Sequence, residues 1–118
     1  MKTQLTGKKG EAEAAVYLRK KGYDILEANF HTRYGEIDLI AKKREIVVFA
    51  EVKTRKDGRF ANAFEAVDRI KQEKIKTCAA SWLAQNDPGS FLQARFDVFE
   101  VYLQSEERVT VNHIENAF

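Results

Sequence analysis

The stretch GEIDLIAKKREIVVFAEVK, residues 35–53, contains two apolar segments separated by a polar turn. Segments 36–41 and 45–53 each alternate their side chains with a period of two, which is typical of β-strands. Residues 42–44 are Lys-Lys-Arg and form the predicted turn. We therefore predict an antiparallel hairpin, in which the ends of the strands away from the turn lie side by side.

Acidic side chains lie at those ends. In the first strand Glu36 and Asp38 share one face, and the opposite face is predicted to carry Ile37 and Leu39. Asp38 and Glu51 lie at similar distances from the turn, one on each strand. The hairpin would make them cross-strand or diagonal neighbours.

The second strand is predicted to place Lys53 on the same face as Glu51. That face also carries Val47 and Phe49, and the opposite face carries Ile46, Val48, Ala50 and Val52. Neighbouring carboxylates resist burial unless a positive charge lies between them, and Mg²⁺ or Mn²⁺ suits oxygen ligands. Lys53 would then meet the attacking water or the scissile phosphate. The alternative is a surface ion pair that needs no ligand.

Apolar periodicity predicts five further elements. They are a helix over residues 7–21 with Thr6 as its cap and Gly22 at its end, a strand over 23–30, a helix over 62–85, a strand over 94–103 and an edge strand over 108–114. The order is αβββαβ(β). We predict one domain spanning residues 1–118, with an α+β fold whose helices cover a mixed sheet.

Glu11 lies on the apolar side of the first predicted helix. It falls at helical spacing with Ala15 and Leu18, on the stripe that should face the core. A carboxylate is unusual there, so we predict that Glu11 joins the acidic site. The alternative is that Glu11 lies in solvent in the first turn, where an acid suits the helix dipole.

The second predicted helix has an apolar stripe with a cationic interruption. The stripe consists of Val67, Ile70, Ile75, Cys78 and Trp82. Lys71 interrupts it and either reaches the site or extends to solvent. Gln72, one position off the stripe, is a weaker candidate for the site. Cys78 is predicted to be a core residue rather than a nucleophile.

The composition is that of an ordinary water-soluble domain, with 44% hydrophobic and 32% charged residues. A single cysteine cannot form an intrachain disulfide, which fits a reducing compartment. No apolar run approaches the roughly 20 residues of a membrane-spanning helix, and the N-terminus lacks the apolar stretch of a signal peptide. We therefore predict a cytoplasmic protein with no membrane partner.

The net charge of +2 is unevenly distributed. Residues 53–76 contain eight Lys/Arg against four acids, whereas residues 97–118 contain five acids and one Arg. Basic regions of this kind suit a phosphate backbone, although solvated helices and a solvated loop are the alternative. The residues predicted to contact nucleic acid are Arg33, Arg55, Lys56, Arg59 and Lys71. Neither His31 nor His113 has a pattern that indicates a ligand.

Several motifs in order resemble one bacterial family. They are Gly10-Glu11 in the first helix, GEIDLI at 35–40, VFAEVKTR at 48–55, RFDV at 95–98 and NAF at 116–118. This set covers nearly the whole chain and resembles the YraN family of endonuclease-like proteins. That family is similar in turn to archaeal Holliday-junction resolvases and, more distantly, to restriction endonucleases.

The resemblance implies a restriction-endonuclease-like αβββαβ core with a PD-(D/E)xK centre. Glu51 and Lys53 match the (D/E)xK half, and Asp38 matches the preceding acid, although Ile37 stands in place of the proline. Carried over by motif, Glu11, Asp38, Glu51 and Lys53 would form the catalytic set. The three acids of that set would hold Mg²⁺ or Mn²⁺.

The leading hypothesis is a Mg²⁺- or Mn²⁺-dependent endonuclease that hydrolyses phosphodiester bonds of DNA, with branched or structured DNA among its expected substrates. One alternative is a nucleic-acid-binding module on the same fold with little or no catalysis. Another is a scaffold whose charges are only surface charges. Small nucleases that cut two strands commonly act as two-fold dimers. A homodimer could use the apolar C-terminal residues and the face of helix 62–85.

Overall fold

The computed structural model of the protein describes residues 2–55, 67–105 and 107–118. Its elements are α1 (Lys2–Lys20), β1 (Asp24–Thr32), β2 (Gly35–Lys43), β3 (Ile46–Arg55), α3 (Arg69–Asn86), β4 (Gln93–Leu103) and β5 (Val109–Ile114). The strands form one sheet in the order β1-β2-β3-β4-β5, in which β3 and β4 are parallel and the other neighbours are antiparallel. The predicted α+β fold with a mixed sheet is therefore confirmed.

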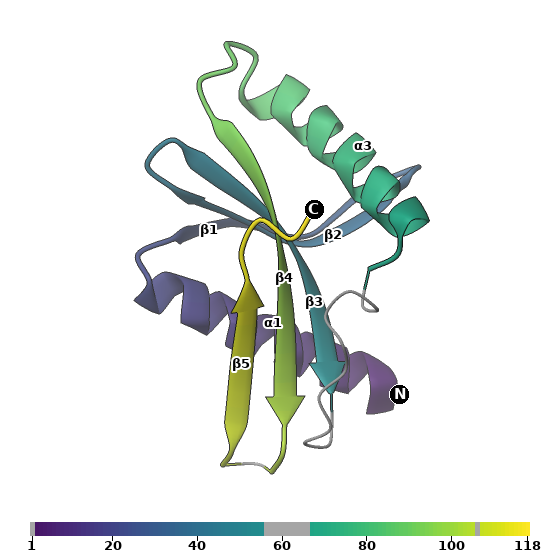
Figure 1. Ribbon diagram of the computed structural model, residues 1–118, viewed down its shortest axis with the longest axis vertical. Helices are drawn as coiled ribbons and strands as arrows, with labels where there is room; N and C mark the ends of the chain where they lie inside the picture. Colours follow the sequence, from purple (N-terminus) through teal and green to yellow (C-terminus); the bar gives the residue numbers. More distant parts are fainter. Residues whose placement is uncertain (1, 56–66, 106) are drawn as a thin grey trace.

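Helices α1 and α3 cover opposite faces of this sheet (Figure 1). The core on the α1 side includes Leu18, Val48, Ala50, Val52 and Phe99. The core on the α3 side includes Val47, Phe49, Ile75, Cys78 and Trp82. The period-two alternation predicted for β3 is thus confirmed, and each fully buried large side chain contributes roughly 1.5–3 kcal/mol.

The end of α1 was predicted correctly, but its beginning was not. Gly22 has a φ of +93°, its N–H donates to Arg19 O, and Tyr23 N–H donates to Leu18 O. These bonds form a Schellman motif, in which glycine takes the left-handed position. At the other end the helix begins at Lys2 rather than at residue 7, so Thr6 lies within it and is not the cap. A threonine can also continue a helix, so its presence does not by itself mark a boundary.

Helix α3 begins later than the sequence suggests. It starts at Arg69, and its cap Asp68 accepts a hydrogen bond of 2.8 Å from Lys71 N–H. Of the predicted helix 62–85, residues 67 and 68 are therefore not helical, and residues 62–66 lie outside the described residues. Ile70 is 70% exposed and was wrongly assigned to the apolar stripe, because the buried face of the helix runs through Ile75, Cys78 and Trp82.

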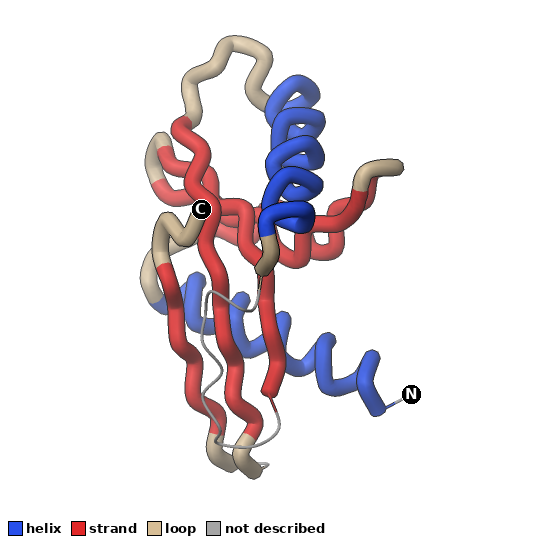
Figure 2. The backbone as a smooth tube through the Cα atoms, turned by 45° about the vertical axis from the view of Figure 1, so that its right-hand side comes forward, coloured by secondary structure: helices blue, strands red, loops and turns tan. Residues whose placement is uncertain are grey.

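Strand β2 separates from β3 at Asp38. The pairing of these strands runs from Lys43↔Ile46 to Leu39↔Ala50. Beyond it, Val52 N–H donates to the Asp38 carboxylate over 2.8 Å, in place of a bond between backbones. Figures 1 and 2 show the β1–β2 hairpin crossing away from the long strands here.

This separation also turns the strand. Ile37 packs in the core on the α3 side, whereas Leu39 packs in the core on the α1 side. The prediction that these two residues share a face was therefore wrong, because alternation is interrupted where the pairing with β3 ends. The result is an opening between β2 and β3 that Asp38 borders.

Helix α1 approaches β3 closely at Gly10. A Cβ atom added to Gly10 would lie 1.9 Å from Thr54 Oγ1 and 3.0 Å from Thr54 Cβ, which no rotation of the threonine relieves fully. At Gly7 the added atom would have no heavy atom of the described chain within 4 Å, its own helix aside. The missing side chain of Gly10 therefore allows α1 to lie against the end of β3.

We expect Gly10→Ala to lower the free energy of unfolding by about 1–3 kcal/mol, because the new methyl group overpacks this contact. Gly7→Ala is the matched control and should raise it by about 0.5–1 kcal/mol, since alanine is the better helix former. Urea unfolding of both variants measures the difference. An equal gain in stability in both would contradict the close approach.

The C-terminal residues pack within their own chain. Ala117 N–H donates to Phe96 O over 2.7 Å, and the rings of Phe118 and Phe96 stack with centroids 5.4 Å apart. The apolar ending that we considered for a dimer interface thus covers the core on the α3 side. A homodimer stays a prediction.

Candidate active site

Acidic side chains from α1, β2 and β3 meet at the opening between β2 and β3. Carboxylate oxygens of Glu11, Glu36 and Asp38 all lie within 4.8 Å of one another. Glu51 on β3 is within hydrogen-bonding reach of the Asp38 carboxyl. Asp38 and Glu51 are buried, with exposures of 9% and 6%. A pocket of about 220 Å³ opens here, lined by Gly35, Glu36, Asp38, Glu51, Lys71, Lys74 and Ile75.

Local structure holds two of these acids in place. The close contact at Gly10 brings the following residue, Glu11, to the end of β3. The side chain of Asn29 on β1 forms a hydrogen bond with Glu11. Asn29 has a φ of +56°, a left-handed conformation that asparagine tolerates better than most residues. Asp38 is held by the Val52 N–H.

The pocket holds more negative charge than its buried surroundings favour. Burial raises the pKa of Asp38 to about 8, and the neighbouring charge of Glu51 adds to this, while the hydrogen bond from Val52 opposes it. Burial also raises the pKa of Glu11, against the hydrogen bond with Asn29 and together with the charges of Glu36 and Glu51. Closely spaced oxygens with uncompensated charge favour a cation.

Two lysines provide positive charge beside Glu51. Lys71 on α3 places its Nζ 3.1 Å from a Glu51 carboxylate oxygen. Burial alone would lower the pKa of Lys71, but the charge of Glu51 outweighs it and the pKa is raised. Burial and the nearby Lys71 ammonium lower the pKa of Lys53, although Glu51 and Asp38 oppose the change. Two adjacent ammonium groups suit an anion such as a phosphate.

The structure brings Glu11, Asp38, Glu51 and Lys53 together, as the sequence predicts. Their catalytic and metal-binding roles stay predictions. Glu36, which was predicted to share a face with Asp38, contributes its carboxylate to the same group, and one of its oxygens lies 3.0 Å from His31 Nε2. No pattern in the sequence pointed to Asn29, because a polar residue in an exposed strand is common.

The residues predicted to contact nucleic acid are in different situations. Arg33 is exposed in the turn between β1 and β2, and Arg55 is half-buried at the end of β3. Lys71 reaches the site and does not simply extend to solvent. Lys56 and Arg59 lie outside the described residues.

Gln72 and Cys78 are not in the acidic pocket. The Gln72 amide donates to Val67 O over 3.1 Å, in a neighbouring apolar groove, so its weaker assignment to the site was wrong. Cys78 is fully buried in the core on the α3 side, as predicted, and its sulfur lies 3.0 Å from the Thr32 hydroxyl.

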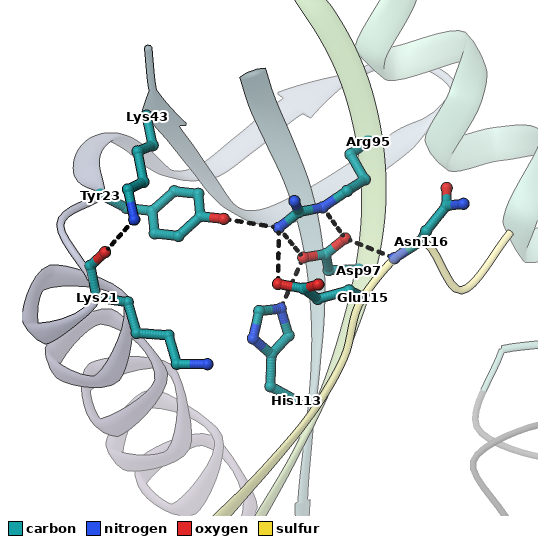
Figure 3. Close-up of polar contacts among 8 residues, drawn as sticks. All are labelled: Lys21, Tyr23, Lys43, Arg95, Asp97, His113, Glu115 and Asn116. Atoms are coloured by element: carbon teal, nitrogen blue, oxygen red, sulfur yellow. Dashed lines mark hydrogen bonds and ion pairs between the residues drawn. The ribbon is translucent and has the colours of Figure 1, made fainter. Parts of the chain in front are cut away.

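A second polar cluster, which the sequence did not reveal, lies on the α1 side of β4 (Figure 3). Asp97 is fully buried and accepts two hydrogen bonds of 2.9 Å from the Arg95 guanidinium and one of 3.0 Å from Asn116 N–H. The His113 Nε2 lies 2.6 Å from the same carboxylate. Arg95 also donates to the Tyr23 hydroxyl over 2.8 Å.

This cluster fastens the C-terminal segment to β4. Burial would raise the pKa of Asp97, but the hydrogen bonds from His113, Arg95 and the Asn116 N–H outweigh it and bring the pKa below its ordinary value. His113, which showed no signal in the sequence, is thus part of a buried ionic network. The sequence offered two hints, an aspartate within the apolar run FDVFEV and the family-like motif RFDV at 95–98, but neither pointed to His113.

Along the described ranges 2–55, 67–105 and 107–118, no helix combines the length and hydropathy that a membrane crossing requires.

Comparison with known proteins places the chain in a family. The family model described as "Uncharacterised protein family UPF0102" matches residues 10–101. A UPF0102 protein of Caldanaerobacter subterraneus is 50% identical over 114 residues, covering 95% of this chain and 93% of the relative. UPF0102 proteins of Syntrophomonas wolfei and Nocardia farcinica are 48% and 40% identical over 109 and 115 residues, covering 92% and 98% of this chain and 93% and 90% of the relatives. The chain therefore belongs to family UPF0102, the YraN-type nuclease-like family whose motifs it carries.

Proposed function

We propose that the protein is a metal-dependent endonuclease that hydrolyses phosphodiester bonds of DNA at the acidic pocket, with branched or structured DNA among its substrates. The observation that carries this proposal is the meeting of Asp38, Glu51 and Lys53 at one opening of the sheet. A cytoplasmic location is part of the proposal, because DNA is the substrate.

Mg²⁺ or Mn²⁺ fits the side chains of the pocket. The donors are carboxylate oxygens, which hard divalent cations prefer, and burial together with the charge of Glu51 raises the pKa of Asp38, a change that a bound cation would oppose. Asp38, Glu51 and Glu11 would hold the ion. Oxygens of Glu11, Glu36 and Asp38 lie within 4.8 Å of one another, so Glu36 offers a further ligand, and Glu51 comes within hydrogen-bonding reach of Asp38. When bound, such an ion supplies charge for the phosphate and lowers the pKa of a water.

The protein's own residues would orient the carboxylates, bind the phosphate and stabilise the charge that develops on it. Val52 N–H and Lys71 fix the directions of the Asp38 and Glu51 carboxylates. Lys53, beside Lys71, would bind an oxygen of the scissile phosphate and stabilise the charge that grows on it as the water oxygen bonds to phosphorus and the ester bond breaks. The half-buried setting strengthens these interactions relative to open solvent.

The test is incubation with flap, junction, single-stranded and linear duplex DNA in Mn²⁺. We expect cleavage of at least one of these DNAs by the wild type. Cleavage should fall about a hundredfold or more in Glu51→Gln, which loses an acid of the pocket, and in Lys53→Met, which loses the cation near Glu51 and Lys71. Glu45→Gln is the matched control, because Glu45 is exposed at the β2–β3 turn, at the far end of the strand pair.

Cleavage that persists in both pocket variants would identify a contaminating nuclease. Salt-sensitive DNA binding without cleavage in any divalent cation would instead support the binding-module alternative.

A further inference from the structure

The turn between β1 and β2 presents an exposed aromatic ring beside the acidic pocket. Arg33 and Tyr34 connect the two strands, and the next residues, Gly35 and Glu36, line the pocket. Tyr34 is 46% exposed. Figures 1 and 2 show this turn extending past α3, away from the body of the sheet. A large ring in such a position is available to a ligand that reaches the pocket.

Several contacts hold this ring in place. The Arg33 guanidinium lies 4.9 Å from the centroid of the Tyr34 ring and donates to its hydroxyl over 2.7 Å. The Tyr34 backbone N–H donates to Thr32 Oγ1 over 3.0 Å, and this threonine hydroxyl in turn contacts the Cys78 sulfur of α3. A Cβ added to Gly35 would already be in van der Waals contact with Lys74 and Cys78. The turn is thus fixed to α3, and little conformational freedom remains to be lost when the ring binds a partner.

The cations around the ring suit an anionic partner. Arg33 lies beside the ring, and Lys71 and Lys74 line the neighbouring pocket together with Glu36, Asp38 and Glu51, whose charges a bound divalent cation would offset. A flat aromatic surface combined with cations matches a nucleic acid strand whose bases are unpaired, because stacking needs an open base face and the cations need a phosphate backbone. In a fully paired duplex both faces of each internal base are already stacked.

The distance between Tyr34 and the acidic group suits a DNA strand that enters the pocket. Tyr34 precedes Glu36 by two residues, which corresponds to roughly 7 Å along an extended chain. A nucleotide next to the one at the acidic group can span such a distance.

We propose that Arg33 and Tyr34 form a stacking platform, which binds an unpaired base of the DNA next to the phosphate that is cut. This inference rests on the proposed function and narrows it to DNA with unpaired nucleotides at the site of cleavage.

The experiment measures binding without cleavage, by fluorescence anisotropy in Ca²⁺. The probes are a flap DNA with 2-aminopurine in its unpaired strand and a fully paired duplex. Tyr34→Ala is expected to weaken binding of the flap DNA about tenfold, while binding of the duplex changes less than about twofold. Stacking should quench the emission of 2-aminopurine in the wild type and not in Tyr34→Ala.

Two variants serve as controls. Tyr34→Phe retains the ring and should keep both the affinity and the quenching. Phe91→Ala removes a ring that is 81% exposed in the loop between α3 and β4, and it should change neither.

The outcomes separate this inference from the proposed function. The proposed platform is refuted if Tyr34→Ala binds flap DNA like the wild type, or if it loses affinity for duplex DNA to the same extent as for flap DNA. In either case the proposed nuclease function is still decided by the cleavage test alone. A wild type that binds neither DNA would refute both. Selective loss in Tyr34→Ala, together with full cleavage by Glu51→Gln, would refute the nuclease site and the placement of the platform beside a cut phosphate, and would leave Tyr34 as a site that only binds unpaired bases.

Discussion

Replacing Asp38 by asparagine is expected to stabilise the metal-free protein by roughly 2 kcal/mol at about pH 8 and to reduce DNA cleavage by about a thousandfold or more. Stability should rise while cleavage falls, because the negative charge of Asp38 would hold the cation and is also the charge that is unfavourable to bury. The asparagine side-chain oxygen can still accept the hydrogen bond from Val52 N–H. Its amide group can donate to Glu51, where the protonated Asp38 would otherwise do so.

The gain in stability should depend on pH. An aspartate has a pKa of about 4 in an unfolded chain, and in the folded protein the pKa of Asp38 is raised to about 8. The stability that protonated Asp38 contributes is therefore complete below about pH 4 and is lost as the pH rises through about 8. The advantage of Asp38→Asn over the wild type should grow across this window, as urea unfolding in a chelator at several pH values would show.

Asp38→Ala serves as the control for this effect. It removes the charge but also the acceptor for Val52 N–H, so it should be less stable than Asp38→Asn by about 1–2 kcal/mol. An Asp38→Asn variant that is less stable than the wild type at every pH would contradict the prediction that the charge of Asp38 destabilises the metal-free fold. Calorimetric titration with Mn²⁺ should give site-specific heat for the wild type and none for either variant.

Asp97→Ala is expected to lower the free energy of unfolding by about 3–5 kcal/mol, because it breaks a charged network and takes the fully buried carboxylate from the largely buried Arg95 guanidinium. Arg95 is only 18% exposed, and its guanidinium directs two hydrogen bonds at Asp97. The substitution also removes the acceptor for Asn116 N–H and the partner of His113. This loss is a large fraction of the 5–15 kcal/mol that ordinary domains have.

A nearby carboxylate provides the control. Glu115 lies 3.6 Å from the same guanidinium but is 56% exposed, and Glu115→Gln should cost no more than about 1 kcal/mol. Thermal unfolding of both variants measures the contrast, and equal stabilities would show that burial of the Asp97 network has little energetic weight.

The same network predicts a response to acid. The pKa of Asp97 is lowered in the folded protein, so its contribution is present above the ordinary pKa of about 4 and is lost as the pH falls below it. The stability gap between the wild type and Asp97→Ala should narrow in that range.

The sequence predicts the meeting of Asp38 and Glu51 because two physical rules are enough for it. Side chains alternate along a strand, and a hairpin brings residues at similar distances from its turn together. Glu11 followed from helical spacing alone. These rules act over short distances in the chain, and they also account for the order of the elements.

The features that the sequence does not predict depend on contacts between distant segments. Alternation does not show where β2 leaves β3, because Ile37 and Leu39 are equally apolar and fit either side of the sheet. Asp97 and His113 are 16 positions apart and meet only through the pairing of β4 with β5. The exposure of Ile70 follows from the point at which α3 begins, which the cap Asp68 sets.

The separation of β2 from β3 has a mechanical consequence. Asp38 lies on the β1–β2 hairpin, whereas Glu51 lies on β3, in the part of the sheet formed by β3, β4 and β5. The backbone pairing of β2 with β3 ends at Leu39↔Ala50, one residue before Asp38 and one before Glu51. Any cation shared by these carboxylates would cross-link the hairpin to β3 where the backbone does not, so binding of the ion would make this part of the sheet more rigid as well as supply the chemistry.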